Sequence, residues 1–168
     1  MKPCSIALLH AAAAAPGARA VFANQQQAFD TLPGELLARI EKRLLLQDES
    51  VDGEGRLREG YAEVHDPRES TGAQHPLVCS HPESRRRALF LGRRRNSYVI
   101  GLPLPESEAL LDALWTHATQ PALTWAHDWR SGDTLLWDNR CLLHRHDAGV
   151  AESQSLMLRV QVRGERPR

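Results

Sequence analysis

The sequence predicts a mainly β fold that carries a helical insert, and two patterns support this prediction. Towards the end of the chain, apolar and polar residues alternate with a period of two, which is typical of strands with one buried face. Between residues 25 and 46, apolar residues recur instead at spacings of three, four and seven, which indicates helix. With 168 residues, of which 42% are apolar, the chain is long enough for one core, so we expect a single domain over residues 1–168.

The first twenty residues allow two interpretations. Lys2, the apolar run over residues 6–15 and the small residues around Arg19 together imitate a short secretory signal. The same run also fits a buried strand that starts at Ser5. His10 interrupts the apolar run, and this favours the strand.

Residues 25–46 are expected to form two helices. Pro33 stands at the start of the second helix, where its missing N–H costs nothing. The apolar positions share one helical face, which we expect to pack inward. This face consists of Phe29, Leu36, Leu37, Ile40 and Leu44.

The middle of the chain shows little periodicity. Residues 47–87 are rich in charge and glycine, so we expect a long excursion with at most short strands. Short strands are then expected at residues 88–91 and 97–101, followed by an amphipathic helix over residues 105–119. From residue 123 alternation returns, which places Leu123, Trp125, His127 and Trp129 on one face of a strand.

The balance of charge excludes some partners. The 21 basic and 21 acidic residues leave no net field that would favour nucleic acid or an anionic membrane. The arginine runs at residues 85–87 and 93–95 lack interleaved aromatic residues, so we interpret them as solvated loops. No apolar run approaches the roughly 20 residues that a membrane span needs. We therefore expect neither nucleic acid nor a membrane as a partner.

The cysteines indicate a reducing compartment. Cys4, Cys79 and Cys141 are odd in number and show no Cys-x-x-Cys spacing, which argues against a disulfide framework and against a structural zinc site. We expect three reduced thiols in a cytoplasmic protein.

The last predicted strand, residues 155–163, places a charge on one of its faces. Leu156, Leu158, Val160 and Val162 share one face, and Ser155, Met157, Arg159 and Gln161 share the other. A buried guanidinium is costly unless an anion meets it. Arg159 therefore pairs with an internal carboxylate such as Asp138, reaches solvent, or holds the carboxylate or sulfonate of a ligand. The sequence leaves these alternatives open.

One stretch near the end carries a family resemblance. Trp129-Arg-Ser-Gly-Asp133 leads into Trp137-Asp-Asn-Arg140, His144 follows, and Leu156-Met-x-Arg159 comes later. This order resembles the taurine dioxygenase (TauD/TfdA) family of Fe(II)/2-oxoglutarate oxygenases, and the resemblance extends from Ser5 to Pro167. It implies a double-stranded β-helix, a jelly roll of the clavaminate synthase-like type, of which this chain would hold the C-terminal part. It also implies that His144 occupies the place of the distal iron ligand, and that Arg159 occupies the place of a residue that contacts the substrate anion.

Other positions depart from the family pattern. The family takes its first two iron ligands from a His-x-Asp/Glu pair upstream of the strand that begins here near Met1, and we expect this pair to be absent from an N-terminally truncated chain. His81-Pro82-Glu83 has the spacing but belongs to a loop motif of the family. A surrogate site of His144, His146 and Asp147 is the other alternative, although adjacent residues on a strand point to opposite sides.

The 2-oxoglutarate anchors are also substituted. The resemblance places Ala20 where the family has a threonine and Ser155 where it has an arginine. We therefore expect neither Fe(II) nor 2-oxoglutarate to bind tightly, and we assign no catalytic residue.

Three functions remain open. The first is a degenerate, inactive member of the family, a pseudoenzyme whose relatives hydroxylate small anionic substrates. The second is an active dioxygenase that an upstream segment or a partner chain completes. The third is a non-catalytic anion-binding or interaction protein. Because missing strands would leave an unpaired sheet edge, we also expect a homo-oligomer.

Overall fold

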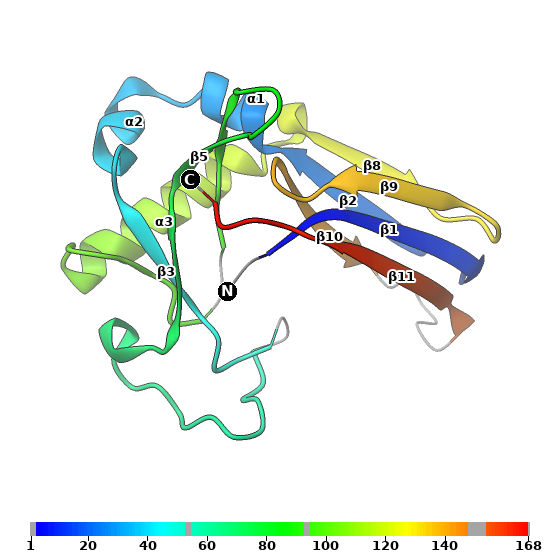
Figure 1. Cartoon of the computed structure of the whole chain (residues 1–168), viewed down its shortest axis with the longest axis horizontal. Coiled ribbons are helices and arrows are strands. Elements are labelled where there is room, and N and C mark those ends of the chain that lie inside the picture. The colour runs from blue at the N-terminus through cyan, green and yellow to red at the C-terminus, as the bar shows by residue number, and fades with distance from the viewer. Residues whose placement is uncertain (1–2, 53–54, 93–94, 148–153, 168) are drawn as a thin grey trace.

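The computed structural model describes residues 3–52, 55–92, 95–147 and 154–167. Strands β1, β2, β8, β9, β10 and β11 lie together on one side of the molecule, and the three helices lie with β3 on the other side (Figure 1). In chain order the elements are β1 (Cys4–Ala13), β2 (Arg19–Asn24), α1 (Gln25–Asp30), α2 (Gly34–Ile40), β3 (Leu44–Asp48), β4 (Gly72–Pro76), β5 (Val78–Ser80), β6 (Arg87–Leu89), β7 (Tyr98–Val99), α3 (Leu104–Ala118), β8 (Thr124–Asp128), β9 (Thr134–Asp138), β10 (Leu142–Asp147) and β11 (Leu156–Arg163).

Two antiparallel sheets form the β-helix. The first has the order β11-β1-β9 and the second the order β10-β2-β8. One apolar cluster fills the space between them. Two facing antiparallel sheets around a common core are the architecture of a jelly roll, which confirms the predicted fold class. The stretch that the sequence could also assign to a secretory signal forms β1, the central strand of the first sheet.

Small and large side chains alternate in the core of the β-helix. Alanines supply the small members, and Ala7, Ala11 and Ala20 are completely buried. Phe22 and Trp137 supply the large ones, and both are 5% exposed. The missing bulk at the alanines lets the aromatic rings fill the space between the sheets, so the barrel interior is a packed core.

The helical insert packs against a small sheet in which β3 lies between β4 and β7. Asn24 caps α1, because its side-chain oxygen accepts the backbone N–H groups of Gln26 and Gln27 at 3.1 and 3.0 Å. α3 matches the predicted helix within one residue at each end and buries the expected apolar stripe. The buried residues of this stripe are Leu110, Leu111, Leu114 and Ala118.

The prediction of helix up to residue 46 was wrong at its end. α2 ends at Ile40, Lys42 adopts a left-handed backbone conformation with φ 63°, and Leu44–Asp48 forms β3. In this strand Leu45 is completely buried, whereas Leu44 is 38% exposed. A short run of leucines fits a buried strand as well as a helix, and pairing with β4 and β7 selects the strand.

The last strand leaves an apolar face uncovered. β11 starts one residue later than predicted and forms an edge of its sheet. Its outward row is half exposed or more, and Leu136 on β9 adds a further side chain that is 67% exposed. The row consists of Leu156, Leu158, Val160 and Val162. Among the described residues, β11 is therefore an edge strand with an exposed apolar face.

Among the described residues, none of the helices is long and apolar enough to cross a membrane.

Candidate functional site

His144 lies on β10 and points into the β-helix. It stands opposite Phe22 of β2, with 6.3 Å between the two ring centroids, and its ring centroid is 5.0 Å from that of Trp137. Burial between these rings lowers the pKa of His144 to about 4, and the positive charges of His146 and Arg159 act in the same direction. The imidazole is therefore neutral at pH 7, which is the state that can ligate a metal.

His146 lies two residues further along the same face. Its ring centroid is 5.5 Å from that of His144, and His146 is exposed. Partial burial and the charge of Arg159 lower the pKa of His146. The surrogate metal site does not form among these residues, because Asp147 accepts a hydrogen bond from Arg145 at 3.0 Å on the other side of the strand.

Arg159 lies on β11 opposite the buried Leu9 of β1, so its side chain starts on the inner face of the sheet. It is exposed, and its charge reaches both His144 and His146. The internal partner that the sequence suggested is engaged elsewhere, because Asp138 binds His81 and Arg140. Within the described part of the chain no ion pair joins Arg159 to a carboxylate, and Arg159 is exposed.

The two positions of the 2-oxoglutarate anchors offer no clamp. Ala20 is completely buried on β2 and has only a methyl group. The hydroxyl of Ser155 accepts the backbone N–H of Ala15 at 3.0 Å.

The donors around His144 do not fit the iron site of this type of oxygenase. That site needs two histidines and a carboxylate on one face of the metal. In the described ranges, the one group of three or more metal-binding side chains whose ligand atoms lie close together does not include His144. Among the described residues, the imidazole of His144 lies beside a second imidazole, that of His146, and within reach of the charge of Arg159.

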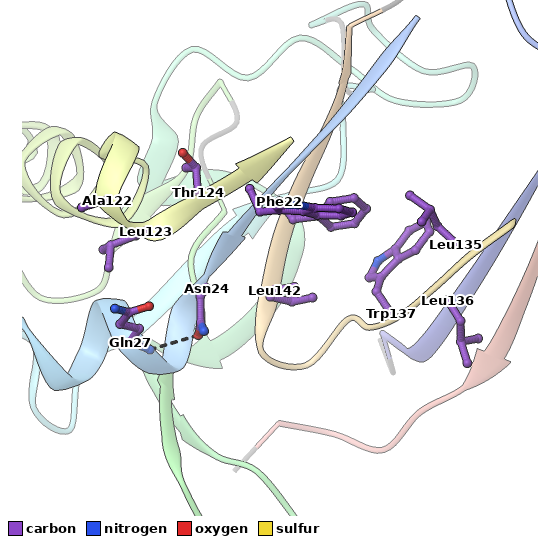
Figure 2. Close-up of a pocket in the computed structure, with 11 residues that line it drawn as sticks. Phe22, Asn24, Gln27, Ala122, Leu123, Thr124, Leu135, Leu136, Trp137 and Leu142 are labelled. Carbon is purple, nitrogen blue, oxygen red and sulfur yellow. Dashed lines mark hydrogen bonds between the residues drawn. The ribbon is translucent and has the colours of Figure 1, made fainter. Parts of the chain in front are cut away.

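A cavity of about 340 Å³ opens beside Trp137 (Figure 2). Its walls are mostly apolar, and the indole N–H of Trp137 has no hydrogen-bond partner among the described residues. The lining residues are Phe22, Asn24, Gln27, Ala122, Leu123, Thr124, Trp125, Leu135, Leu136, Trp137 and Leu142. An apolar group with one hydrogen-bond acceptor would fit such a wall. Sequence reasoning missed this cavity, although Trp137 lies in a motif that it singled out.

A second polar cluster surrounds Asp138. Burial raises the pKa of Asp138, but hydrogen bonds from Arg140 and His81 outweigh this effect and hold it well below its ordinary value. Arg140 also binds Glu83 at 2.9 Å, so His81 and Glu83 of the His81-Pro82-Glu83 motif both belong to this network. The motif is therefore committed to Asp138 and Arg140, and His144 receives no ligand pair from it.

The comparisons with known families agree with the geometry. The family described as "Taurine catabolism dioxygenase TauD, TfdA family" matches residues 2–161. The chain is 35% identical over 161 residues to the (S)-phenoxypropionate/alpha-ketoglutarate-dioxygenase of Sphingobium herbicidovorans. The match covers 89% of this chain and 53% of that protein. It is also 35% identical over 128 residues to the alpha-ketoglutarate-dependent 2,4-dichlorophenoxyacetate dioxygenase of Cupriavidus pinatubonensis. This match covers 74% of this chain and 42% of that protein. The chain thus spans about half the length of these curated relatives.

Solved structures resemble the chain along nearly its whole length. The crystal structure of AAD-2 in complex with Mn(II) and N-oxalylglycine superposes with a TM-score of 0.83 at 29% identity, covering 99% of this chain and 66% of that one. A taurine dioxygenase from Burkholderia xenovorans superposes with a TM-score of 0.79 at 25% identity, covering 99% of this chain and 56% of that one.

Proposed function

The chain belongs to the TauD/TfdA family of taurine catabolism dioxygenases, and on this premise we propose that the 168 residues form a non-catalytic member that retains an anion site. Family members use Fe(II) and 2-oxoglutarate. The observation that carries the proposal is that His144, which the resemblance assigns to the distal iron ligand, belongs to no group of three or more potential metal ligands among the described residues. Without bound iron the family reaction has no site at which oxygen could be activated.

The retained site would bind a small carboxylate or sulfonate. Arg159 supplies a guanidinium that can bind such a group through two hydrogen bonds. The neutral rings of His144 and His146 can each donate one hydrogen bond without adding positive charge. Trp137 contacts His144 and also lines the apolar cavity, so an anion with an apolar group could reach both. The phenoxypropionate and dichlorophenoxyacetate named for the relatives are of this kind, and we propose this class as the ligand.

Two measurements on the purified chain test the loss of catalysis. Anaerobic titration with Fe(II) should show no saturable iron site that His144→Ala removes. Succinate formation from 2-oxoglutarate, with phenoxyacetate present, should stay at the level of a blank without protein. One tightly bound iron per chain that is lost in His144→Ala, or succinate formation that His144→Ala abolishes, would show that the chain is an enzyme.

The anion site is tested by ligand-induced stabilisation. Phenoxyacetate should raise the melting temperature of the wild-type chain in a concentration-dependent manner, because a ligand that binds the folded state stabilises it. Arg159→Gln should abolish the increase. Arg163→Gln is the matched control, since Arg163 shares the strand and the face but lies about 13 Å away, and it should keep the increase.

A second function is favoured by one specific observation. A jelly roll has eight strands, whereas among the described residues each of the two sheets of the β-helix has three, with β10 and β11 both at sheet edges. His144 and Arg159 lie on these two strands. We propose that a further segment could add one strand beside β10 and one beside β11, and that it could bring a His-x-Asp pair next to His144. The completed protein would then be an active dioxygenase. An in-frame His-x-Asp segment in the DNA upstream of Met1, together with turnover by the longer product, would support this function over the first.

A further inference from the structure

A group of metal-binding side chains lies outside the barrel interior. His81 follows β5, whereas Asp138 and Cys141 flank the turn between β9 and β10. Their ligand atoms, the imidazole nitrogen, a carboxylate oxygen and the thiol sulfur, all lie within 4.8 Å of one another. The side chain of His81 is 10% exposed and that of Asp138 is 27% exposed, so the group is partly shielded from water.

We propose that His81, Asp138 and Cys141 bind a thiophilic divalent cation of the Zn²⁺ type, at a site independent of His144. Zinc accepts nitrogen, oxygen and sulfur ligands together, and three protein ligands leave its fourth position open.

The distances need only small adjustments. His81 Nε2 lies 2.9 Å from Asp138 Oδ2. With bonds of about 2.0 Å, two such donors on a tetrahedral zinc are about 3.3 Å apart, so the pair must open by about 0.4 Å. A zinc–sulfur bond of about 2.3 Å places the sulfur about 3.5 Å from the other donors, and a rotation about the first side-chain torsion of Cys141 can close a gap of about 1 Å.

A metal at Nε2 of His81 requires a change of tautomer, and Glu83 can accept the proton in its new position. In the metal-free chain Nδ1 accepts the backbone N–H of Ser84 at 3.2 Å, so the Nε2 proton points to Asp138. A cation at Nε2 would replace that proton, and the ring would then carry its proton on Nδ1. Glu83 Oε2 lies 3.3 Å from Nδ1 and can accept it. A carboxylate that accepts the second N–H of a ligating histidine is the usual support of such a ligand.

The charges balance when the cation is bound. The carboxylate of Asp138 and the thiolate of Cys141 together carry two negative charges, which offset the two positive charges of the cation. Arg140 and Glu83 form an ion pair at 2.9 Å and offset each other. Burial raises the pKa of the Cys141 thiol, so the thiol is protonated in the metal-free chain and must release a proton when the cation binds.

A neighbouring cavity provides access. It has a volume of about 400 Å³, and His81, Glu83 and Arg140 form part of its wall. Of the three proposed ligands, His81 is the one that lines this cavity. Cys4 and Cys79 also line it, and they provide internal controls because neither belongs to the group of three.

Titration with Co²⁺ as a spectroscopic substitute for Zn²⁺ tests the site. The double variant Cys4→Ser/Cys79→Ser keeps Cys141 as its sole thiol and should show a sulfur-to-cobalt charge-transfer band that saturates at one cobalt per chain. The band should disappear on addition of Zn²⁺, and one proton should be released per cobalt bound. His144→Ala should behave in the same way.

Cys141→Ser and His81→Ala should lose the band, while circular dichroism shows whether each variant is folded. If His81→Ala does not fold, Cys141→Ser decides, because serine retains the size of the side chain. Cobalt spectra without a charge-transfer band, or a band that survives in Cys141→Ser, would overturn the proposal. Since His144 is not involved, the result is independent of the test for iron.

Discussion

Replacing His144 by phenylalanine tests whether burial in the barrel holds this imidazole neutral. Phenylalanine keeps an aromatic ring beside Phe22 and Trp137 but removes the group that titrates. In the folded chain the pKa of His144 is lowered from 6.5 to about 4. As the pH falls, the unfolded chain therefore takes up this proton first.

The sign and size of the effect follow from this difference. Because the folded-state pKa is depressed, the stability is fully present above pH 6.5 and is lost as the pH falls from 6.5 towards 4. A shift of this size corresponds to at most about 3.4 kcal/mol. Because the ring is only partly buried, solvent screening reduces the expected loss to about 2 kcal/mol.

The assay is urea unfolding of wild type and variant across this pH window. Burial also lowers the pKa values of His75 and His146, so the wild-type slope is a sum, and the difference between the two proteins isolates His144. Wild type should lose about 2 kcal/mol more than His144→Phe. His65→Gln, at an exposed loop position, should follow wild type. Parallel curves for wild type and His144→Phe would refute the reasoning.

Three further outcomes are expected. 2-Oxoglutarate at millimolar concentration should leave the melting temperature unchanged, and a clear thermal shift in the unmodified chain would contradict this. Ser155→Arg alone should not restore succinate formation, because the metal ligands are still incomplete. The soluble chain should sediment as a dimer or larger through the open edge and apolar face of β11, and Val160→Lys should shift it towards monomer; a wild-type monomer at all concentrations would contradict it. Leu45→Ala should cost about 2–5 kcal/mol in urea unfolding, and Leu44→Ala less than about 1 kcal/mol, because adjacent residues of β3 face opposite sides; equal costs would be inconsistent with the strand.

The parts of the fold with a single clear periodicity could be predicted from the sequence. The alternation in residues 156–163 identifies both the strand and its two faces, and the stripe in residues 104–118 identifies α3. β3 could not be predicted in the same way, because three consecutive leucines satisfy a helical and a strand pattern equally, and the choice depends on pairing with β4 and β7.

The candidate site was predictable to different degrees. His144 and Arg159 follow from the order of motifs, and the structure places them close enough for the charge of Arg159 to lower the pKa of His144. Their roles as ligand and anion contact stay predictions, as does the cytoplasmic location expected from the cysteines. The group around Asp138 could not be found by spacing, because His81 lies 57 residues before Asp138 in the chain and only the tertiary fold brings them together.

The position of β1 has a consequence for how the chain folds. β1 lies between β9 and β11, and its pairing joins Cys4 to Arg163. During synthesis the first strand therefore leaves the ribosome long before either of its neighbours. Contacts of such long sequence separation close late, and folds dominated by them take about milliseconds to seconds to form. Until β9 has been released, both edges of β1 are open, and one edge stays open until β11 follows. Chaperone binding to the nascent chain, or shortening of β11, should therefore change the yield of folded protein.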